Sequence, residues 1–161
     1  MSENSPQITV VCTGNTCRSP MAERLLQHAL AAEPEPLRSI EVVSAGVAAF
    51  PGDAASENAV RALSKVGIDL QDHRSTRFSY QLLDRSSVVL AMTESHRDFI
   101  RHEFPEDETP VLLFREFMQD ANPEVPDPCG GPLDYYIETR DSLAEAIPSL
   151  LSFLRKNFPK S

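Results

Sequence analysis

A polar loop reads Val-Cys-Thr-Gly-Asn-Thr-Cys-Arg-Ser-Pro over residues 11–20, between two apolar patterns. The residues before it, 8–11, form a short β-branched run, which predicts a buried strand. After it, apolar residues recur at spacings of three and four, which predicts a helix; they are Met21, Leu25, Leu26 and Ala29. The loop therefore lies between a strand and a helix, where open α/β sheets bind their ligands.

This loop has the composition of an anion-binding turn. Ser19 is a residue type favoured as a helix N-cap, and Pro20 fits the first helical position. The loop amides and the helix N-terminus then make a site that favours an anion, most naturally phosphate. Gly14 and Asn15 are residue types that tolerate positive φ, which such a loop needs. The sequence therefore predicts a phosphate-binding loop.

The two ends of the loop carry a nucleophile and a cation. Cys12 begins it and Arg18 ends it. The loop amides, the helix dipole and Arg18 all favour the thiolate form of Cys12, and the Ser19 hydroxyl can donate to its sulfur. The planar Arg18 guanidinium can grip two phosphoryl oxygens. These groups fit covalent phosphoryl transfer, whereas the alternative is a buried structural cysteine beside an ordinary strand-to-helix turn.

The rest of the chain alternates strands and helices. Further strands are expected at 40–43, 87–92 and 111–114, and helices at 54–66, 81–84, 95–103 and 134–158. Gly67 is the expected C-cap of the second helix, and Pro148 should kink the last one or split it in two. Continuous apolar strands between helices indicate an α/β fold, with a parallel sheet covered on both faces.

Composition sets the class of protein. The chain has 161 residues, 41% hydrophobic and 24% charged, which fits one domain over 1–161 with flexible ends at 1–7 and 159–161. No stretch reaches the ~20 apolar residues of a membrane span, and the N-terminus does not resemble a signal peptide. The net charge of −9 argues against nucleic-acid and membrane partners. Three cysteines in such a chain predict free thiols in the cytoplasm.

Residues 12–20, continued by Met-Ala-Glu at 21–23, resemble the loop of the low-molecular-weight protein tyrosine phosphatase family. Other matching segments are Ser-Ala-Gly at 44–46, Asp-His-Arg at 72–74, Leu-Ala-Met at 90–92 and Asp-Pro at 127–128. The resemblance runs from about residue 8 to residue 154. It implies a three-layer α/β/α fold with a four-stranded parallel sheet, and phosphorylated proteins as substrates. It also implies that no metal or other cofactor is needed, in keeping with four histidines that do not cluster around the cysteines.

The resemblance also assigns roles. Cys12 would become a phosphocysteine, Arg18 would bind the phosphoryl group, and Asp127 would be general acid and then general base. From the sequence itself, the rigid Pro-Asp-Pro setting of Asp127, followed by Gly-Gly at 130–131, suits a carboxyl held above a pocket. The phosphate-binding residues would be Thr13, Gly14, Asn15, Thr16, Cys17 and Ser19. Ser44 and His73 would support the loop, and His73 is expected to be structural rather than a proton-transfer group.

Thr16 bears on the substrate. Tyrosine-specific members usually carry a bulky aliphatic residue at this position, so Thr16 resembles the bacterial protein-arginine-phosphatase branch, as do residues 127–131 and the segment around Tyr136. A threonine hydroxyl can face a polar guanidinium, whereas an aliphatic side chain would pack on a phenyl ring. We expect phosphoarginine over phosphotyrosine, with tyrosine phosphatase activity as the alternative and an incidental loop threonine as the simplest reading.

Two cysteines raise further questions. Both branches usually place an aromatic wall residue after the Asp-Pro pair, where this chain has Cys129, so Phe50 or Tyr135 would have to supply the aromatic contact. Cys17 matches the family's second loop cysteine, which can form a reversible disulfide with the nucleophile. Redox sensitivity through Cys12 and Cys17 is thus a secondary expectation, and the alternative for Cys17 is a small packing residue.

Other classes fit less well. A thiol-coupled arsenate reductase would need more cysteines after the third strand, but residues 84–104 contain none. The Asp-Pro pair at 127–128 argues against a sugar-phosphotransferase component, because such a carrier must not hydrolyse its own phosphocysteine. A non-catalytic phosphate-binding module would not need a cysteine, an arginine and an aspartate together. A dinucleotide-binding domain would show Gly-x-Gly-x-x-Gly after the first strand, and that pattern is absent.

Overall fold

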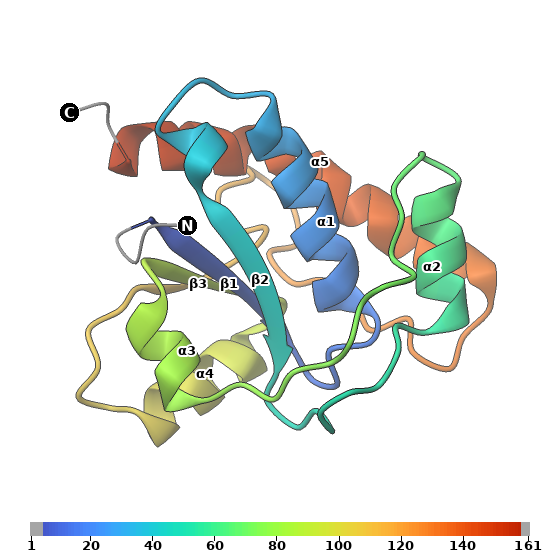
Figure 1. Cartoon of the computed structure of the whole chain (residues 1–161), viewed down its shortest axis with the longest axis horizontal. Helices are drawn as coiled ribbons and strands as arrows, with labels where there is room; N and C mark the ends of the chain where they lie inside the picture. The colour runs from blue at the N-terminus through green and yellow to red at the C-terminus, as the bar shows by residue number, and fades with distance from the viewer. Residues whose placement is uncertain (1–4, 159–161) are drawn as a thin grey trace.

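Four parallel strands form one sheet in the order β2-β1-β3-β4 in the computed structural model, which describes residues 5–158 (Figure 1). The strands are β1 (Gln7–Cys12), β2 (Glu41–Gly46), β3 (Val88–Ala91) and β4 (Val111–Leu113). β1 is central, because it pairs with β2 on one side and β3 on the other. Its last residue, Cys12, lies in register with Gly46 at the carboxyl edge of the sheet.

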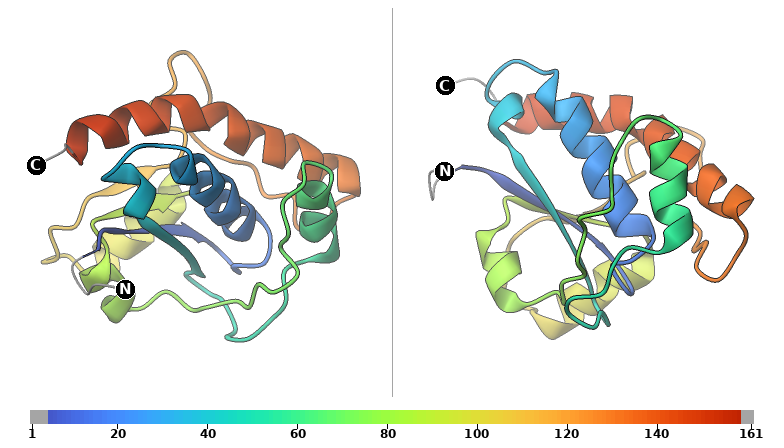
Figure 2. Two further views of the ribbon diagram at one scale, coloured as in Figure 1. Left: turned by 45° about the horizontal axis from the view of Figure 1, so that its top comes forward. Right: turned by 45° about the vertical axis from the view of Figure 1, so that its right-hand side comes forward.

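Helices cover both faces of the sheet, so the predicted three-layer α/β/α fold is confirmed (Figures 1 and 2). One face carries α1 (Arg18–Ala31), α2 (Glu57–Ser64) and α5 (Leu133–Asn157), and the other carries α3 (Tyr80–Arg85) and α4 (Glu94–Glu103). A short 3-10 helix, η1 (Leu37–Ser39), precedes β2. No helix within residues 5–158 has the length and apolar character needed to cross a membrane.

The strand side chains alternate between two cores. Ile8, Val10 and Cys12 belong to the larger core, which α1, α2 and α5 complete. Val11 and Val89 belong to the smaller core on the opposite face, with Leu83 of α3 and Ile100 of α4 among its members. This period of two, with both faces buried, is the pattern of a parallel sheet. It explains why the strands were visible in the sequence as apolar runs.

Two segment boundaries differ from expectation. Residues 54–56 were assigned to the second helix, but α2 begins at Glu57, because the Ser56 amide donates to the Thr16 carbonyl (2.9 Å) and so is tied to the phosphate-binding loop. Gln7 was assigned to a flexible end, but it begins β1 and is buried. Ser5 and Pro6 were assigned to the same flexible end, but their carbonyls accept hydrogen bonds from Arg85 Nη1 (2.9 Å) and from the Glu41 amide (3.0 Å). The remaining expected flexible residues, 1–4 and 159–161, lie outside the described part of the chain.

Pro148 does not split the last helix. α5 is one continuous helix from Leu133 to Asn157 (Figure 2). Proline removes one backbone hydrogen bond, the one to the carbonyl four residues earlier. Both Pro148 and Ala144 are exposed, so water can reach the carbonyl that loses its partner. The opposite face of α5 is buried, and this packing keeps the helix in one piece.

Candidate active site

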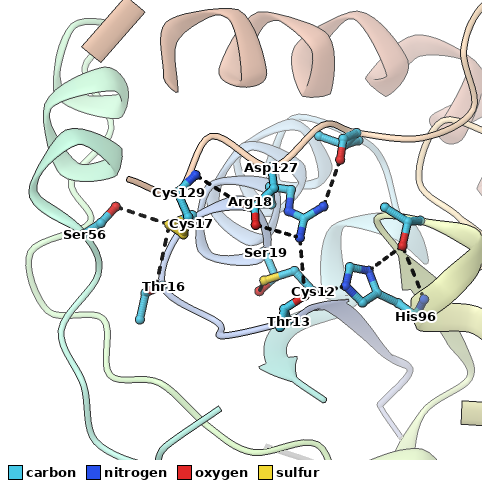
Figure 3. A network of polar contacts seen from close by, with 12 residues as sticks. Cys12, Thr13, Thr16, Cys17, Arg18, Ser19, Ser56, His96, Asp127 and Cys129 are labelled. Atoms are coloured by element: carbon cyan, nitrogen blue, oxygen red, sulfur yellow. Dashed lines mark hydrogen bonds and ion pairs between the residues drawn. A yellow bond between two sulfur atoms is a disulfide. The ribbon is translucent and has the colours of Figure 1, made fainter. Parts of the chain in front are cut away.

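Cys12 lies at the end of β1, with its side chain only 2% exposed. Its Sγ is 2.9 Å from the Ser19 Oγ (Figure 3). Ser19 was expected to cap a helix that begins at Pro20, but α1 begins two residues earlier, at Arg18, and Cys17 occupies the N-cap position. The Ser19 hydroxyl is directed back at the nucleophile instead. This contact, rather than a helix cap, explains a serine at this place.

Asn15 organises the loop from beneath. It has a φ of +56°, the left-handed conformation that was expected near this position. Its Nδ2 donates to the Ser19 Oγ (2.8 Å) and to the Ser44 Oγ (3.0 Å), and its Oδ1 accepts from the Thr76 amide (2.8 Å). The His73 Nε2 donates to the Asn15 carbonyl (2.8 Å). Because the Ser19 oxygen already accepts from Asn15, its own hydrogen can be donated to the Cys12 sulfur.

Gly46 lets β2 end directly under the loop. A Cβ at this position would lie 2.5 Å from the Thr13 carbonyl oxygen and 2.8 Å from the Asn15 amide nitrogen. Backbone atoms cannot yield to such a contact, so only glycine fits. The Ala48 amide, just after β2, donates to the Thr13 carbonyl (2.9 Å) and fixes the segment that leads to Phe50.

Arg18 is buried, with one edge of its guanidinium committed to the protein. Its Nη1 donates to the Val125 carbonyl (2.9 Å), and its Nη2 lies 3.7 Å from the Asp127 Oδ2 and 3.5 Å from the Thr13 Oγ1. The Nε is buried and has no hydrogen-bond partner within residues 5–158. A buried, unpaired cationic donor is costly. The Nε and Nη2 edge is therefore available to grip two oxygens of one anion.

Asp127 lies above this edge, on the loop between β4 and α5. Its side chain is about half exposed, in contrast to the buried Arg18 beside it. Its Oδ1 accepts from the Cys129 amide (3.0 Å), which orients the carboxyl. The structure thus brings together Cys12, Arg18 and Asp127 from two loops that are far apart in the sequence (Figure 3).

The aromatic residues proposed as pocket walls occupy different places. Tyr135 lines a cavity of about 480 Å³ together with Asp127, between the Asp127 loop and α5. Phe50 is 76% exposed, on the loop after β2, and does not line this cavity. Tyr135 is thus the aromatic side chain that shares a cavity with the carboxylate. Cys129 is exposed in place of an aromatic wall.

The cysteines differ from expectation. We expected three free thiols, and a disulfide between Cys12 and Cys17 under oxidation. In the structure Cys17 is bonded to Cys129, with a Cα–Cα distance of 6.3 Å, and Cys12 is the free cysteine. The loop that carries Asp127 folds over the start of α1 and brings Cys129 to Cys17. Thr16 lies next to this bond and is partly buried, with its Oγ1 3.7 Å from the Cys17 Sγ.

His96 is a site residue that sequence reasoning missed. It lies in the first turn of α4, and its Nε2 is 2.8 Å from the Thr13 Oγ1. Its Nδ1 is 3.1 Å from the Thr93 Oγ1, which also caps the helix by accepting from the His96 amide. The available signal was a threonine N-cap three residues before a histidine, at the carboxyl end of a buried strand.

His96 is held neutral. Burial first, and then the charge of the Arg18 guanidinium, lower its pKa to about 4, against the opposite effects of Asp127 and Glu124. A neutral imidazole has one donor and one acceptor nitrogen, which suits a bridge between two threonine hydroxyls. His96 therefore links α4 to the loop residue that contacts Arg18.

The lowered pKa of His96 predicts a stability loss in acid. An unfolded histidine has a pKa near 6.5, so between pH 6.5 and about 4 the unfolded chain takes up a proton that folded His96 refuses. Acidification from pH 7 to pH 4.5 should therefore destabilise the wild type, with His96 contributing up to about 2 kcal/mol. Urea unfolding at both pH values, for the wild type and His96→Asn, measures this contribution.

The matched control is His28→Asn, because His28 is exposed on α1. This variant should lose as much stability on acidification as the wild type. His96→Asn should lose less. An equal loss in His96→Asn and the wild type would show that His96 is not held neutral by the fold.

A comparison with family models decides the family. The model described as "Low molecular weight phosphotyrosine protein phosphatase" matches residues 7–160. The chain belongs to this family. The fold, the phosphate-binding loop and the phosphatase class predicted from the sequence agree with this membership.

Three members of the low-molecular-weight phosphatase family illustrate its range. A protein-arginine-phosphatase of Bacillus subtilis is 41% identical, over 93% of this chain and 97% of that protein. A solved YwlE arginine phosphatase, a cysteine-to-serine mutant with a phosphorylated active-site serine, is 38% identical with a TM-score of 0.82, covering 94% of this chain and 97% of its own. The tyrosine phosphatase Wzb of Escherichia coli K30, in complex with sulphate, is 34% identical with a TM-score of 0.81, covering 92% and 97%.

Proposed function

We propose that this low-molecular-weight phosphatase hydrolyses phosphoarginine in phosphorylated proteins, through a phosphocysteine on Cys12. The observation that carries the proposal is the buried Arg18 Nε, which has no hydrogen-bond partner within residues 5–158, beside an Nη2 that lies 3.7 Å from Asp127. A phosphoryl group held on this Nε and Nη2 edge lies over the Cys12 loop, with the Asp127 carboxyl on its other side. This is the arrangement that in-line displacement at phosphorus requires.

The first step transfers the phosphoryl group to sulfur. The Cys12 thiolate attacks phosphorus, and the bond from phosphorus to the guanidine nitrogen of the substrate breaks. Asp127, in its protonated form, gives its proton to that nitrogen as it leaves. The Ser19 hydroxyl, 2.9 Å from the Cys12 Sγ, stabilises the thiolate before attack. Arg18 stabilises the charge on the equatorial oxygens.

The second step returns the enzyme to its starting state. Asp127, now a carboxylate, takes a proton from a water molecule, and the water oxygen attacks phosphorus. The bond between sulfur and phosphorus breaks, inorganic phosphate leaves, and the Cys12 thiolate and the protonated Asp127 are regenerated. The half-exposed position of Asp127 gives water access to the carboxylate at this stage.

Thr16 and the relatives favour phosphoarginine. Thr16 is half-buried on the loop, where its hydroxyl can face a polar substrate group. One Asp127 carboxyl oxygen can accept a hydrogen bond from the N–H groups of the substrate guanidine, while the protonated oxygen gives its proton to the leaving nitrogen. Relatives named protein-arginine-phosphatases share 39–41% of their residues with this chain.

The second candidate is protein tyrosine phosphatase activity. The observation in its favour is Tyr135, an exposed aromatic side chain whose ring lies against Gly131 on the loop that carries Asp127. A phenyl ring could stack on it. The alignment with a relative named as a tyrosine phosphatase also extends over most of this chain.

The choice between the substrates can be measured with matched peptides. We expect a higher kcat/KM on phosphoarginine than on phosphotyrosine peptides, and the opposite order for Thr16→Ile. The aliphatic side chain removes the polar contact and adds apolar area, each change being worth roughly ten-fold or more. Thr16→Ser, which keeps the hydroxyl, is the control and should keep the wild-type order.

Two results would decide against this assignment. Preference for phosphotyrosine in both the wild type and Thr16→Ile would place the chain with the tyrosine phosphatases. Turnover of neither peptide above a Cys12→Ser blank would remove phosphoproteins as substrates and leave small phosphates to be tested. We also expect the enzyme in the cytoplasm, which cell fractionation would check.

A further inference from the structure

A disulfide joins the two loops of the active site. Cys17 belongs to the phosphate-binding loop, and Cys129 lies two residues after Asp127, so the bond spans 112 residues of sequence (Figure 3). The chemistry proposed above uses neither sulfur. The bond nevertheless ends on the loop that carries the proposed general acid.

The Cys17 end of the bond is fixed. Cys17 is only 3% exposed, and its Sγ lies 3.5 Å from the Tyr136 hydroxyl and 3.6 Å from the Ser56 hydroxyl. These groups come from α5 and from the N-cap of α2, so three elements meet at this sulfur. The phosphate-binding loop therefore offers a rigid anchor for whatever is bonded to it.

The Cys129 end lies on a loop with few other anchors. Before Asp127, Val125 is buried and its carbonyl is held by Arg18. After Asp127, the Gly131 amide donates within the loop, to the Pro128 carbonyl (2.8 Å). The one hydrogen bond from this turn to another element, within residues 5–158, is the 3.4 Å contact of Asn58 with the Gly131 carbonyl.

Space is available on the other side of this loop. The cavity of about 480 Å³ is lined by Pro126, Asp127 and Pro128 from the loop and by Tyr135 and Thr139 from α5. Pro128 is buried and the Tyr135 ring lies against Gly131, so packing holds part of this turn, whereas Asp127 and Cys129 themselves are exposed. The disulfide adds a covalent link from this exposed part of the loop to the phosphate-binding loop.

The position of Cys129 directly affects the orientation of the Asp127 carboxyl. Its backbone amide is the donor to the Asp127 Oδ1, at 3.0 Å. A displacement of Cys129 by even 1 Å would lengthen this hydrogen bond or rotate the carboxyl. Cys129 thus forms the disulfide with Cys17 and also orients the Asp127 carboxyl.

We infer that Cys129 is a positioning residue, whose disulfide to Cys17 holds Asp127 over the phosphate-binding loop, and that reduction of this bond weakens general-acid catalysis. The inference rests on the proposed role of Asp127. A dithiol reductant cleaves the bond by thiol–disulfide exchange: the dithiol is oxidised to its own disulfide, and Cys17 and Cys129 each gain a proton and become thiols.

Aryl phosphates with different leaving groups test the inference. Phenoxide is a poor leaving group and needs the acid, whereas p-nitrophenoxide leaves with little help. Relative to the oxidised wild type, we expect kcat/KM on phenyl phosphate to fall roughly ten-fold in dithiol-treated wild type and in Cys129→Ser. On p-nitrophenyl phosphate the fall should be less than about two-fold. Thiol counting on the unfolded chain confirms the redox state: the oxidised protein should have one free thiol, and the reduced protein three.

Two controls separate this inference from the function on which it rests. Dithiol should not change Cys129→Ser, because that variant has no bond to reduce. Asp127→Asn should lose roughly 10²–10⁴-fold on phenyl phosphate. If Asp127→Asn keeps the wild-type dependence on leaving group, the proposed acid is wrong. If Asp127→Asn loses activity on phenyl phosphate, but the oxidised and reduced wild type have the same kcat/KM, the acid is right and the disulfide does not position it. The same conclusion follows if the untreated protein has three free thiols.

Discussion

Replacing Cys12 with serine should abolish turnover and leave phosphate binding intact. A serine hydroxyl is a far weaker nucleophile than a thiolate at neutral pH, so kcat should fall by about 10⁴-fold or more. The groups that would hold the anion are unchanged, because the free edge of Arg18 and the loop fixed by Asn15 do not depend on the sulfur. Peptide assays measure the first effect, and calorimetric titration with inorganic phosphate measures the second.

Mass spectrometry adds a sharper observation for Cys12→Ser. In a solved relative the serine that replaces the cysteine is phosphorylated. The Cys12→Ser variant, incubated with substrate, should likewise gain one phosphoryl group, whereas Cys12→Ala should gain none. Turnover near the wild-type rate in Cys12→Ser would show that Cys12 is not the nucleophile. Loss of phosphate binding in both variants would show that the phosphate site depends on the Cys12 sulfur.

The phosphate-binding loop could be predicted because its parts are contiguous. A β-branched run, a polar loop and a helical pattern follow one another within residues 8–29, so strand, turn and helix N-terminus must meet locally. Even there, the use of Ser19 was assigned wrongly. Its hydroxyl can either cap a helix or reach a neighbouring sulfur, and only the position of α1 decides between them.

Residues that reach the site from far along the chain were harder to predict. Asp127 is one of 24 acidic residues, and it was chosen as the candidate general acid because of its rigid proline setting and the family resemblance. His96 had no such setting, because a histidine in the first turn of a helix has no chemical signature of its own. Its contact with Thr13 arises from the order of β1 and β3 in the sheet.

The disulfide partner was unpredictable for a similar reason. Three cysteines allow three pairings, and the family resemblance favoured Cys12 with Cys17 because they share a loop. The path of the loop after β4 brings Cys129 to Cys17 instead, at a Cα–Cα distance of 6.3 Å. The long loop over residues 114–132, with its four prolines after residue 122, gave no periodicity from which that path could be inferred.

Arg18→Lys should remove both phosphate binding and turnover. Lysine keeps the charge but replaces a planar fork with a single ammonium group. It cannot hold the Val125 carbonyl and still present two donors to one anion, as the Arg18 Nε and Nη2 edge does. We expect kcat/KM to fall by about 10³-fold or more, and phosphate affinity to fall with it. Peptide kinetics and phosphate titration on the same preparation measure both losses.

Arg140→Lys is the matched control for this substitution. Arg140 is another largely buried arginine, whose Nη1 donates to the Ala62 carbonyl (2.9 Å) and whose Nη2 pairs with Asp141, away from the phosphate-binding loop. Its replacement tests the cost of losing a structural guanidinium, which should appear as lower stability with unchanged phosphate affinity. If Arg18→Lys instead binds phosphate within about ten-fold of the wild type, charge alone suffices and the bidentate grip is wrong.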